Sequence, residues 1–213
     1  MATTLSQGDR LTRRRIAAMD EALGHASDIV IADGVGAVSI SEVARRMGMK
    51  PPSLYKYFPS LHALYDALFA RGQRLENDFV AEAVRAVEPG LQGLLARSEA
   101  CIRWAMTRDG RAFGPLLYWR PIPGFEPSPE SFEPSVEMVD GFRSDVTEAV
   151  HRRELAPWAD NDDTVRLLST LVSGICSQQM ANQPLASFED GIFSSLTTSA
   201  LTMFVRYHQE EKP

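Results

Sequence analysis

A short polar patch near residue 55 carries the side chains best suited to bind a partner. Ser53 and Lys56 are three residues apart, so they project from the same side of a helix, and Tyr55 and Tyr57 flank them with hydroxyl groups. An ammonium group can pair with a phosphate or a guanine edge, and hydroxyl groups commonly contact phosphate oxygens. These four side chains therefore favour a helix that lies in the major groove of DNA.

The residues before this patch predict the two helices that would position it. Ser39 and Glu42 have the spacing of a capping box, which marks a helix start. The apolar residues that follow recur at the spacing of one helical face: Ile40, Val43, Ala44 and Met47. Gly48 should end this helix, because glycine adopts the left-handed conformation without steric cost. Pro51 fits the first turn of a second helix, which we expect to reach about Tyr57.

Two crossed helices are not by themselves evidence of DNA binding. Such corners occur in many helical domains of unrelated function. On spacing alone, Tyr55 and Tyr57 could also be half-buried by packing at a corner of this kind. The identity of the residues has to decide between these alternatives.

The residues of both helices resemble the DNA-binding domain of TetR-family transcriptional regulators. The matching residues are Ser39-Ile40-x-x-Val43-Ala44-x-x-Met47-Gly48-Met49, then Ser53-Leu54-Tyr55-Lys56-Tyr57-Phe58 and Ser60. The resemblance covers about residues 12–68, under a third of the chain. It implies a three-helix head that reads DNA, a larger helical domain that binds a small molecule and dimerises, and a palindromic operator. The chain departs from the family pattern at Lys50, where Ser or Thr is usual, and at Leu61, where a Lys that contacts phosphate is usual.

We expect the contacts to double-stranded DNA to come from the first 60 residues. The expected DNA-binding residues are Arg13, Ser39, Lys50, Ser53, Tyr55, Lys56 and Tyr57. Arg13 belongs to a basic run, residues 10–15, at the beginning of a helix that Asp33 and Gly34 should end. These arginines could meet phosphates or reach a minor groove, or they could be a solvated helix start.

The charges of the chain divide into two parts of opposite sign. The whole chain has a net charge of −6. Residues 1–60 hold eight Lys/Arg against six Asp/Glu, and the rest hold 14 against 22, so the two parts carry +2 and −8. Local charge decides phosphate binding, because salt screens charges beyond about 8–10 Å. We therefore place an N-terminal arm and the DNA-binding domain at residues 1–60, and an effector-binding and dimerisation domain at residues 61–213.

Apolar periodicity predicts helices through the second part, so the expected fold class is all-α. We expect a helix over about residues 61–88, then helices over 91–109, 113–119 and 135–154, one that opens at Asp162, and a last one over about 188–207. Gly110 should end the second of these helices. Five prolines in residues 121–134 predict an extended loop at the surface or a lid over a pocket.

A small-molecule pocket is expected within this second part. Aromatic and apolar residues lie on helices that the family would arrange around a cavity: Trp104, Phe113, Tyr118, Trp119, Phe142 and Cys176. Such a lining would suit an apolar or aromatic effector, although an aromatic stripe is also typical of plain core. The last two helices are low in charge and carry small residues, which favours a four-helix interface in a homodimer over burial inside one monomer.

Motifs of catalysis and metal binding are missing from the sequence. It contains no Gly-rich phosphate loop, no His-Glu-x-x-His, no Cys-x-x-Cys and no Gly-x-Ser-x-Gly. The four histidines are far apart in sequence, and Cys101 and Cys176 fit reduced, buried thiols. We therefore expect no enzyme, no metal and no cofactor.

The leading hypothesis is a ligand-responsive repressor that binds a palindromic operator as a dimer. The chain has no run of 18 apolar residues and no apolar N-terminal block, so we expect no membrane partner and a cytoplasmic location. The competing hypothesis is a helical small-molecule-binding protein or enzyme that does not bind DNA.

Overall fold

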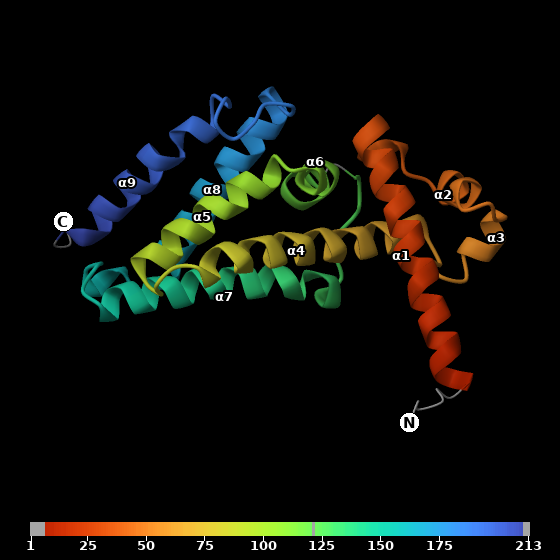
Figure 1. Ribbon diagram of the computed structural model, residues 1–213, viewed down its shortest axis with the longest axis horizontal. Helices are drawn as coiled ribbons and strands as arrows, with labels where there is room; N and C mark the ends of the chain where they lie inside the picture. The colour runs from red at the N-terminus through yellow and green to blue at the C-terminus, as the bar shows by residue number, and fades with distance from the viewer. Residues whose placement is uncertain (1–6, 121, 211–213) are drawn as a thin grey trace.

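The computed structural model describes residues 7–120 and 122–210, and every regular element among them is helical (Figure 1). The α-helices are α1 (Gln7–Asp33), α2 (Ile40–Arg46), α3 (Pro51–Leu54), α4 (Leu61–Arg85), α5 (Leu91–Ala105), α6 (Arg108–Gly114), α7 (Pro129–His151), α8 (Asp162–Asn182) and α9 (Thr197–Gln209). A π-helical turn, Pro115–Trp119, follows α6 directly. The predicted all-α fold class is confirmed. No helix in the described ranges is both long and apolar enough to cross a bilayer.

The molecule is elongated, with a small head at one end. Figure 1 shows α1, α2 and α3 gathered around one end of α4, and the C-terminal end of α9 lies at the opposite end of the molecule. Ser60 begins α4, because its hydroxyl oxygen accepts a hydrogen bond from the amide of Ala63 at 3.0 Å. The 25 residues of α4 span about 38 Å at 1.5 Å per residue. This helix therefore links the head rigidly to the rest of the chain.

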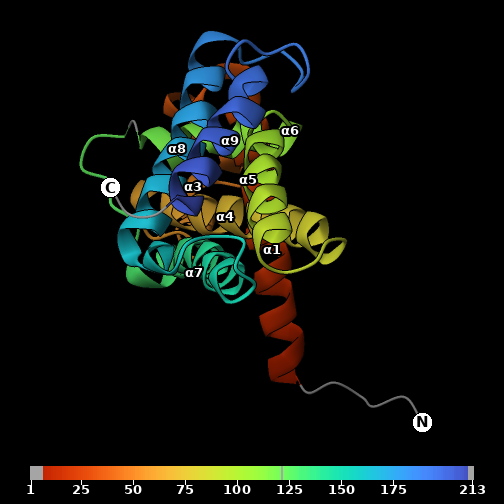
Figure 2. The same cartoon turned by 90° about the vertical axis from the view of Figure 1, so that its left-hand side faces the viewer.

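Two apolar cores lie along α4. The first joins α1, α2, α3 and the first half of α4 to α6 and the π-helical turn, and the second joins α5, α7, α8 and α9. Tyr118, in the π-helical turn, packs against both cores. In Figure 2, turned by 90°, the N-terminal half of α1 projects away from the other helices. Residues 1–6 of the expected N-terminal arm lie outside the described residues, and the division at residue 60 stays a prediction.

The prediction that Gly110 ends a helix is wrong. The preceding helix, α5, already ends at Ala105, and Thr107 caps α6 by accepting a hydrogen bond from the amide of Gly110 at 3.0 Å. A β-carbon at Gly110 would collide with the carbonyl oxygen of Trp104. The glycine is needed because α6 turns tightly across the end of α5. In the sequence, a glycine required by such tertiary packing cannot be told from a glycine that ends a helix.

The prediction of an extended loop over residues 121–134 is wrong for its second half, because α7 begins at Pro129. Ser128 caps this helix through its hydroxyl, which accepts a hydrogen bond from the amide of Ser131 at 3.2 Å. Pro129 occupies the first helical position, where an amide hydrogen would have no partner. Pro134 removes one intrahelical hydrogen bond, and its own carbonyl accepts one from the side chain of Asn77 at 2.8 Å.

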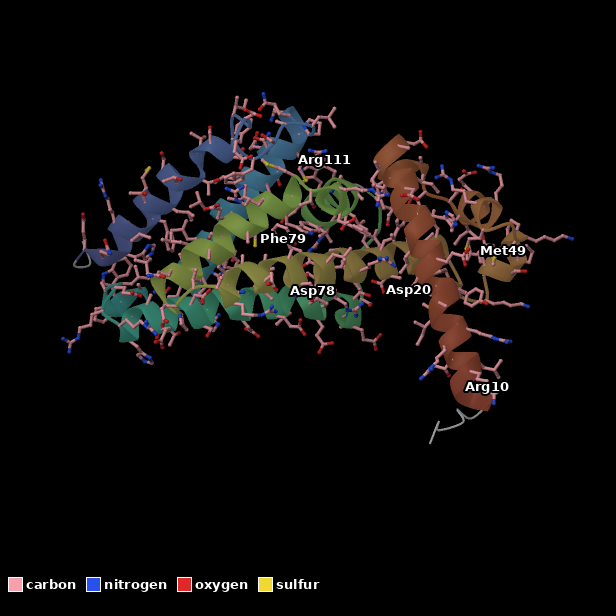
Figure 3. All side chains as sticks on the ribbon, viewed as in Figure 1. Arg10, Asp20, Met49, Asp78, Phe79 and Arg111 are labelled. Atoms are coloured by element: carbon pink, nitrogen blue, oxygen red, sulfur yellow. The ribbon has the colours of Figure 1, made fainter. Side chains whose placement is uncertain are left out.

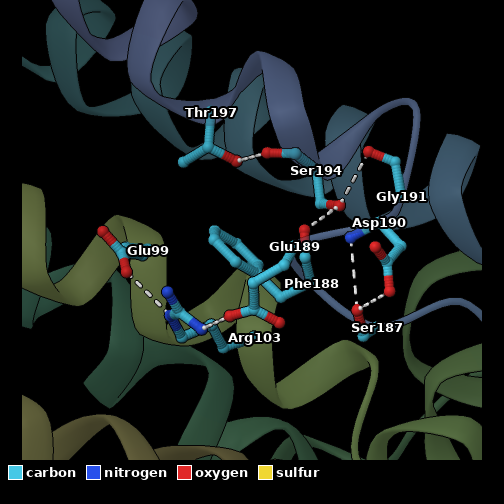
Figure 4. Close-up of polar contacts among 9 residues, drawn as sticks. All are labelled: Glu99, Arg103, Ser187, Phe188, Glu189, Asp190, Gly191, Ser194 and Thr197. Atoms are coloured by element: carbon cyan, nitrogen blue, oxygen red, sulfur yellow. Dashed lines mark hydrogen bonds and ion pairs between the residues drawn. The ribbon is translucent and has the colours of Figure 1, made fainter.

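The connection between α8 and α9 is longer than predicted, since α9 begins only at Thr197. The buried side chain of Gln179 holds this connection by accepting hydrogen bonds from the amides of Phe193 at 3.0 Å and Ser194 at 3.2 Å. On the α5 side, Arg103 pairs with Glu189 at 2.8 Å, and its guanidinium carbon lies 3.8 Å from the ring centre of Phe188 (Figure 4). These contacts fix the direction in which α9 leaves α8.

Candidate nucleic-acid interface and ligand cavity

The first half of the candidate DNA-binding motif has the predicted local structure. The hydroxyl oxygen of Ser39 accepts a hydrogen bond from the amide of Glu42 at 3.2 Å, which begins α2. Hydrogen bonds from Arg45, and then from Arg46, lower the pKa of the Glu42 carboxyl to about 2. After α2 the chain turns at Gly48, whose φ is +67°. This left-handed residue turns the chain toward α3.

The second half presents a polar face on a small apolar base. Leu54 and Phe58 are fully buried in the first core. Tyr55 is 49% exposed, Lys56 is exposed, and Tyr57 is partly buried. The α-helix itself is shorter than expected and ends at Leu54, but the amide of Phe58 still donates a hydrogen bond to the carbonyl of Leu54 at 3.0 Å. This turn keeps Tyr55 and Lys56 directed to solvent.

The structure places the expected DNA-binding residues on three elements of the head. Lys50, Ser53, Tyr55, Lys56 and Tyr57 lie on or beside α3, Ser39 begins α2, and Arg13 lies exposed on α1. Two residues beyond Arg13, the guanidinium carbon of Arg15 lies 5.8 Å from the ring centre of Tyr57, so the basic part of α1 passes beside α3. In Figure 3 the labelled Arg10 lies near the N-terminal end of α1, and Met49 lies in the turn between α2 and α3.

Two lysines on this face have no acidic partner among the described residues. Lys50 and Lys56 are both exposed, and neither forms an ion pair within the part of the chain that the structure describes. By contrast, Arg45 and Arg46 on α2 are both paired with Glu42, at 2.7 and 2.9 Å. The two lysines can therefore pair with phosphates without first giving up a carboxylate.

A cavity of about 300 Å³ lies between α4, α5, the π-helical turn, α7 and α8. Among the residues expected to bind an effector, Tyr118 and Phe142 line it. Trp104 and Phe113 are instead buried in the first core, and Cys176 is buried in the second. Trp119 is 41% exposed and does not line the cavity. The expected set is thus only partly gathered at this cavity, and its role in binding stays a prediction.

Two polar residues of α4 that the sequence analysis missed lie deep in this cavity. Gln73 and Glu76 are 8% and 5% exposed, and the hydroxyl of Tyr118 donates a hydrogen bond to Glu76 Oε1 at 2.6 Å. Burial raises the pKa of Glu76 to about 7, and the hydrogen bond from Tyr118 lowers it by a smaller amount. A signal was present, since Gln73 and Glu76 follow Phe69 at four and seven residues and so occupy core positions of the helix.

Arg120 lies at the opening of the cavity in an unusual conformation. Its φ is +45°, a left-handed value that few residues with a β-carbon adopt. Its exposed guanidinium carbon lies 5.6 Å from the ring centre of Phe69 and 5.5 Å from that of Phe132. The cavity thus combines aromatic walls, a buried acid and amide at its inner end, and a cation at its opening.

The last two helices leave large apolar side chains uncovered. Leu167 on α8 is 50% exposed, and Leu196, Met203 and Tyr207 on or beside α9 are 51%, 73% and 51% exposed. Most of the buried apolar residues of these helices belong to the second core. The outer sides of α8 and α9 are therefore available for contact with another protein surface.

Comparisons with known proteins agree with this arrangement. Residues 23–68 match the family model described as bacterial regulatory proteins, tetR family. The uncharacterized HTH-type transcriptional regulator YobS of Bacillus subtilis (strain 168) is 29% identical over 92 residues, 43% of this chain. That match spans about half (48%) of YobS.

Solved structures share the fold over nearly the whole chain. A protein of unknown function from Rhodococcus sp. RHA1 is similar with a TM-score of 0.73 and 22% identity, over 90% of this chain and 95% of that one. The transcriptional regulator FadR from Bacillus subtilis, solved in complex with stearoyl-CoA, is similar with a TM-score of 0.64 and 13% identity, over 87% and 97%. The match to the tetR family model thus covers the head, which has helix-turn-helix geometry around α3, and the fold of nearly the whole chain is that of these solved structures.

Proposed function

We propose that the protein is a homodimeric transcriptional repressor that binds a palindromic operator and releases it when a small molecule fills the cavity. The observation that carries this proposal is the construction of α3. Its apolar residues, Leu54 and Phe58, are fully buried, while Tyr55 and Lys56 next to them are exposed without a structural role in the core. The regulator would act in the cytoplasm, where the operator is.

In this proposal α3 enters the major groove. Tyr55 and Tyr57 donate hydrogen bonds to phosphates, and Lys56 meets a phosphate or a guanine edge. Lys50 and the arginines of α1 add phosphate contacts around this helix. In a two-fold symmetric dimer, the two copies of α3 reach successive major grooves about 34–36 Å apart.

The dimer would form through the outer sides of α8 and α9. Leu196, Met203 and Tyr207 are each at least half exposed in the single chain, and large apolar side chains gathered on one face mark contact surfaces. Pairing these two helices with the same helices of a second copy would give a four-helix interface. Such an interface fixes the distance between the two heads.

The cavity would control the head through the π-helical turn. Leu116 and Leu117 belong to the first core, and Leu117 and Tyr118 also line the cavity. A ligand that displaces these side chains shifts the turn and α6, and α6 packs directly against α1. The ligand weakens operator binding only to the extent that it binds the shifted arrangement more tightly.

A mobility shift with the DNA upstream of the protein's own gene tests this proposal. At two salt concentrations, operator affinity should fall steeply as salt rises, because each phosphate contact releases bound counterions. Lys56→Ala and Tyr55→Phe should weaken the shifted band, whereas Arg85→Ala, at the far end of α4, should leave it unchanged. If the wild type shifts no DNA at either salt concentration, the alternative of a helical small-molecule-binding protein without DNA binding is favoured.

A further inference from the structure

The inner end of the cavity holds polar groups that the protein itself leaves unsatisfied. Gln73 is 8% exposed, and its side-chain amide forms no hydrogen bond within the described residues. The hydroxyl oxygen of Ser135, another lining residue, is buried without a partner. Buried polar groups normally have hydrogen-bond partners, and leaving them unpaired is costly. These groups therefore indicate that a polar part of a ligand belongs at this end.

Glu76 adds an acceptor of hydrogen bonds at the same place. It lies one helical turn after Gln73, and Tyr118 holds one of its oxygens. Burial raises the pKa of its carboxyl to about 7, so the group is partly ionised near neutral pH. A ligand hydroxyl can donate to the carboxylate and accept from the Gln73 amide. The inner end is therefore suited to a hydroxyl group.

The opening of the cavity favours a negatively charged group of the ligand. Arg120 is exposed there and forms no ion pair in the described ranges, whereas Arg166, the other cation of the lining, is paired with Asp163 at 2.7 Å. The rings of Phe69 and Phe132 stack on each other at 6.1 Å, and the guanidinium lies beside both of them. A planar guanidinium is well matched to a carboxylate.

Helix α4 sets the distance between these two ends. Phe69 lies beside Arg120, and Glu76 is seven residues further along the helix, which corresponds to about 10 Å at 1.5 Å per residue. The walls between the ends are apolar, from Leu117, Met138 and Phe142. A volume of about 300 Å³ is at the lower end of small-molecule sites. One ring with a short chain fits, and a long acyl chain does not.

We propose that the effector is a small aromatic carboxylate with a hydroxyl group at its far end. The carboxylate pairs with Arg120 at the opening, the ring lies against the apolar walls, and the hydroxyl group bonds Glu76 and Gln73 inside. This inference rests on the proposed function, because it specifies the ligand that the regulator would answer to.

Three related probes test the inference in binding measurements without DNA. Calorimetry would compare para-hydroxyphenylpropionate, which has both polar ends, with phenylpropionate, which lacks the hydroxyl, and para-ethylphenol, which lacks the carboxylate. We expect the first probe to bind the wild type about tenfold more tightly than either of the others, the size of one well-placed hydrogen bond or ion pair. Equal affinity for all three probes would overturn the inference.

Variants assign each end of the probe to its residue. Arg120→Ala should abolish the preference for the carboxylate and keep the preference for the hydroxyl, and Gln73→Leu should do the reverse. Arg74→Ala, an exposed residue of α4 that does not line the cavity, is the matched control and should keep both preferences. If Arg120→Ala and Gln73→Leu change all three affinities by the same factor, the proposed orientation is wrong.

The outcome also separates this inference from the proposed function. If the protein shifts operator DNA but shows no preference for the bifunctional probe, the ligand class is wrong and the regulator stands. If the probe binds with the expected preferences but no DNA is shifted, the cavity assignment stands and the regulator falls. Release of shifted DNA by para-hydroxyphenylpropionate, and not by phenylpropionate, would support both.

Discussion

The face around α3 and the cavity beside α4 arrange their polar groups in opposite ways. At α3, Leu54 and Phe58 face inward and the polar side chains point to solvent. In the cavity, Gln73 and Glu76 occupy core positions and their polar groups face inward. A face of the first kind adds binding groups at little cost to stability. A cavity of the second kind must give up stability to keep polar groups ready for a ligand.

The largest expected effect distinguishes the buried residue that stabilises α3 from the exposed residue that is expected to bind DNA. Leu54→Ala should lower the free energy of unfolding by about 2–5 kcal/mol, because it leaves a void in the first core. Tyr55→Ala, one residue away, should change it by no more than about 0.5 kcal/mol while operator binding is lost. Urea unfolding followed by circular dichroism measures both. A large loss of stability in Tyr55→Ala would contradict the assignment of this side chain to DNA.

The cost of the inward-facing acid should appear as a pH dependence of stability. The pKa of Glu76 is about 7 in the folded state and 4.5 without burial, so the folded state binds this proton more tightly. The stabilising contribution is complete below about pH 4.5 and is lost as the pH rises through about 7. The difference corresponds to about 3 kcal/mol.

Glu76→Gln, which carries no titrating proton, is the variant that isolates this effect. Urea unfolding at several pH values should show that the wild type loses about 3 kcal/mol relative to Glu76→Gln between pH 4.5 and 7.5. Asp78→Asn, an exposed acid on the same helix, is the control and should follow the wild type. Parallel curves for the wild type and Glu76→Gln would show that Glu76 is not a buried acid.

A smaller effect is expected where the outward face meets DNA. Lys56→Ala should weaken operator binding about tenfold, with unchanged unfolding, because one exposed cation is removed. If this cation meets a phosphate, the slope of log affinity against log salt concentration should also decrease by about one. Fluorescence anisotropy of labelled operator DNA measures both quantities. An unchanged affinity would remove Lys56 from the interface.

The smallest effect concerns the turn that aims α3. Gly48→Ala should lower the free energy of unfolding by about 1 kcal/mol, because alanine is strained at the φ of +67° found there. Steric collision does not contribute, since no atom lies within 4 Å of an added β-carbon. Gly24→Ala, in the middle of α1 and equally open, should instead stabilise by about 0.5–1 kcal/mol. Thermal unfolding of the two variants gives opposite signs if this reasoning holds.

The same contrast explains what the sequence could and could not predict. The helix start at Ser39, the turn at Gly48 and the apolar pair Leu54 and Phe58 depend on neighbours within a few residues, so local spacing predicted them correctly. Of the capping box only the Ser39 half forms, because the Glu42 carboxylate binds Arg45 and Arg46. The cavity is lined from five separate elements, and sequence spacing says little about which side chains face it. Tyr118 and Phe142 were predicted among its lining, and Gln73 and Glu76 were missed.

The errors in the fold have the same physical origin. Gly110 and Pro134 were taken as helix breakers, and both lie inside helices. Gly110 is required by the close approach of α6 to α5, and Pro134 is held against α4 by the hydrogen bond that the side chain of Asn77 donates to its carbonyl. Each depends on an element that is distant in sequence, which local propensity cannot describe.

Tyr118 packs against both cores, and in the proposed mechanism this shared side chain would couple the cavity to the head. Thermodynamic linkage is reciprocal. If a bound ligand lowers the affinity for the operator by some factor, bound operator lowers the affinity for the ligand by the same factor. Protein molecules already bound to DNA would then bind the ligand only at higher ligand concentrations than free molecules. The sensitivity of the response would thus depend on how many operator sites the cell offers.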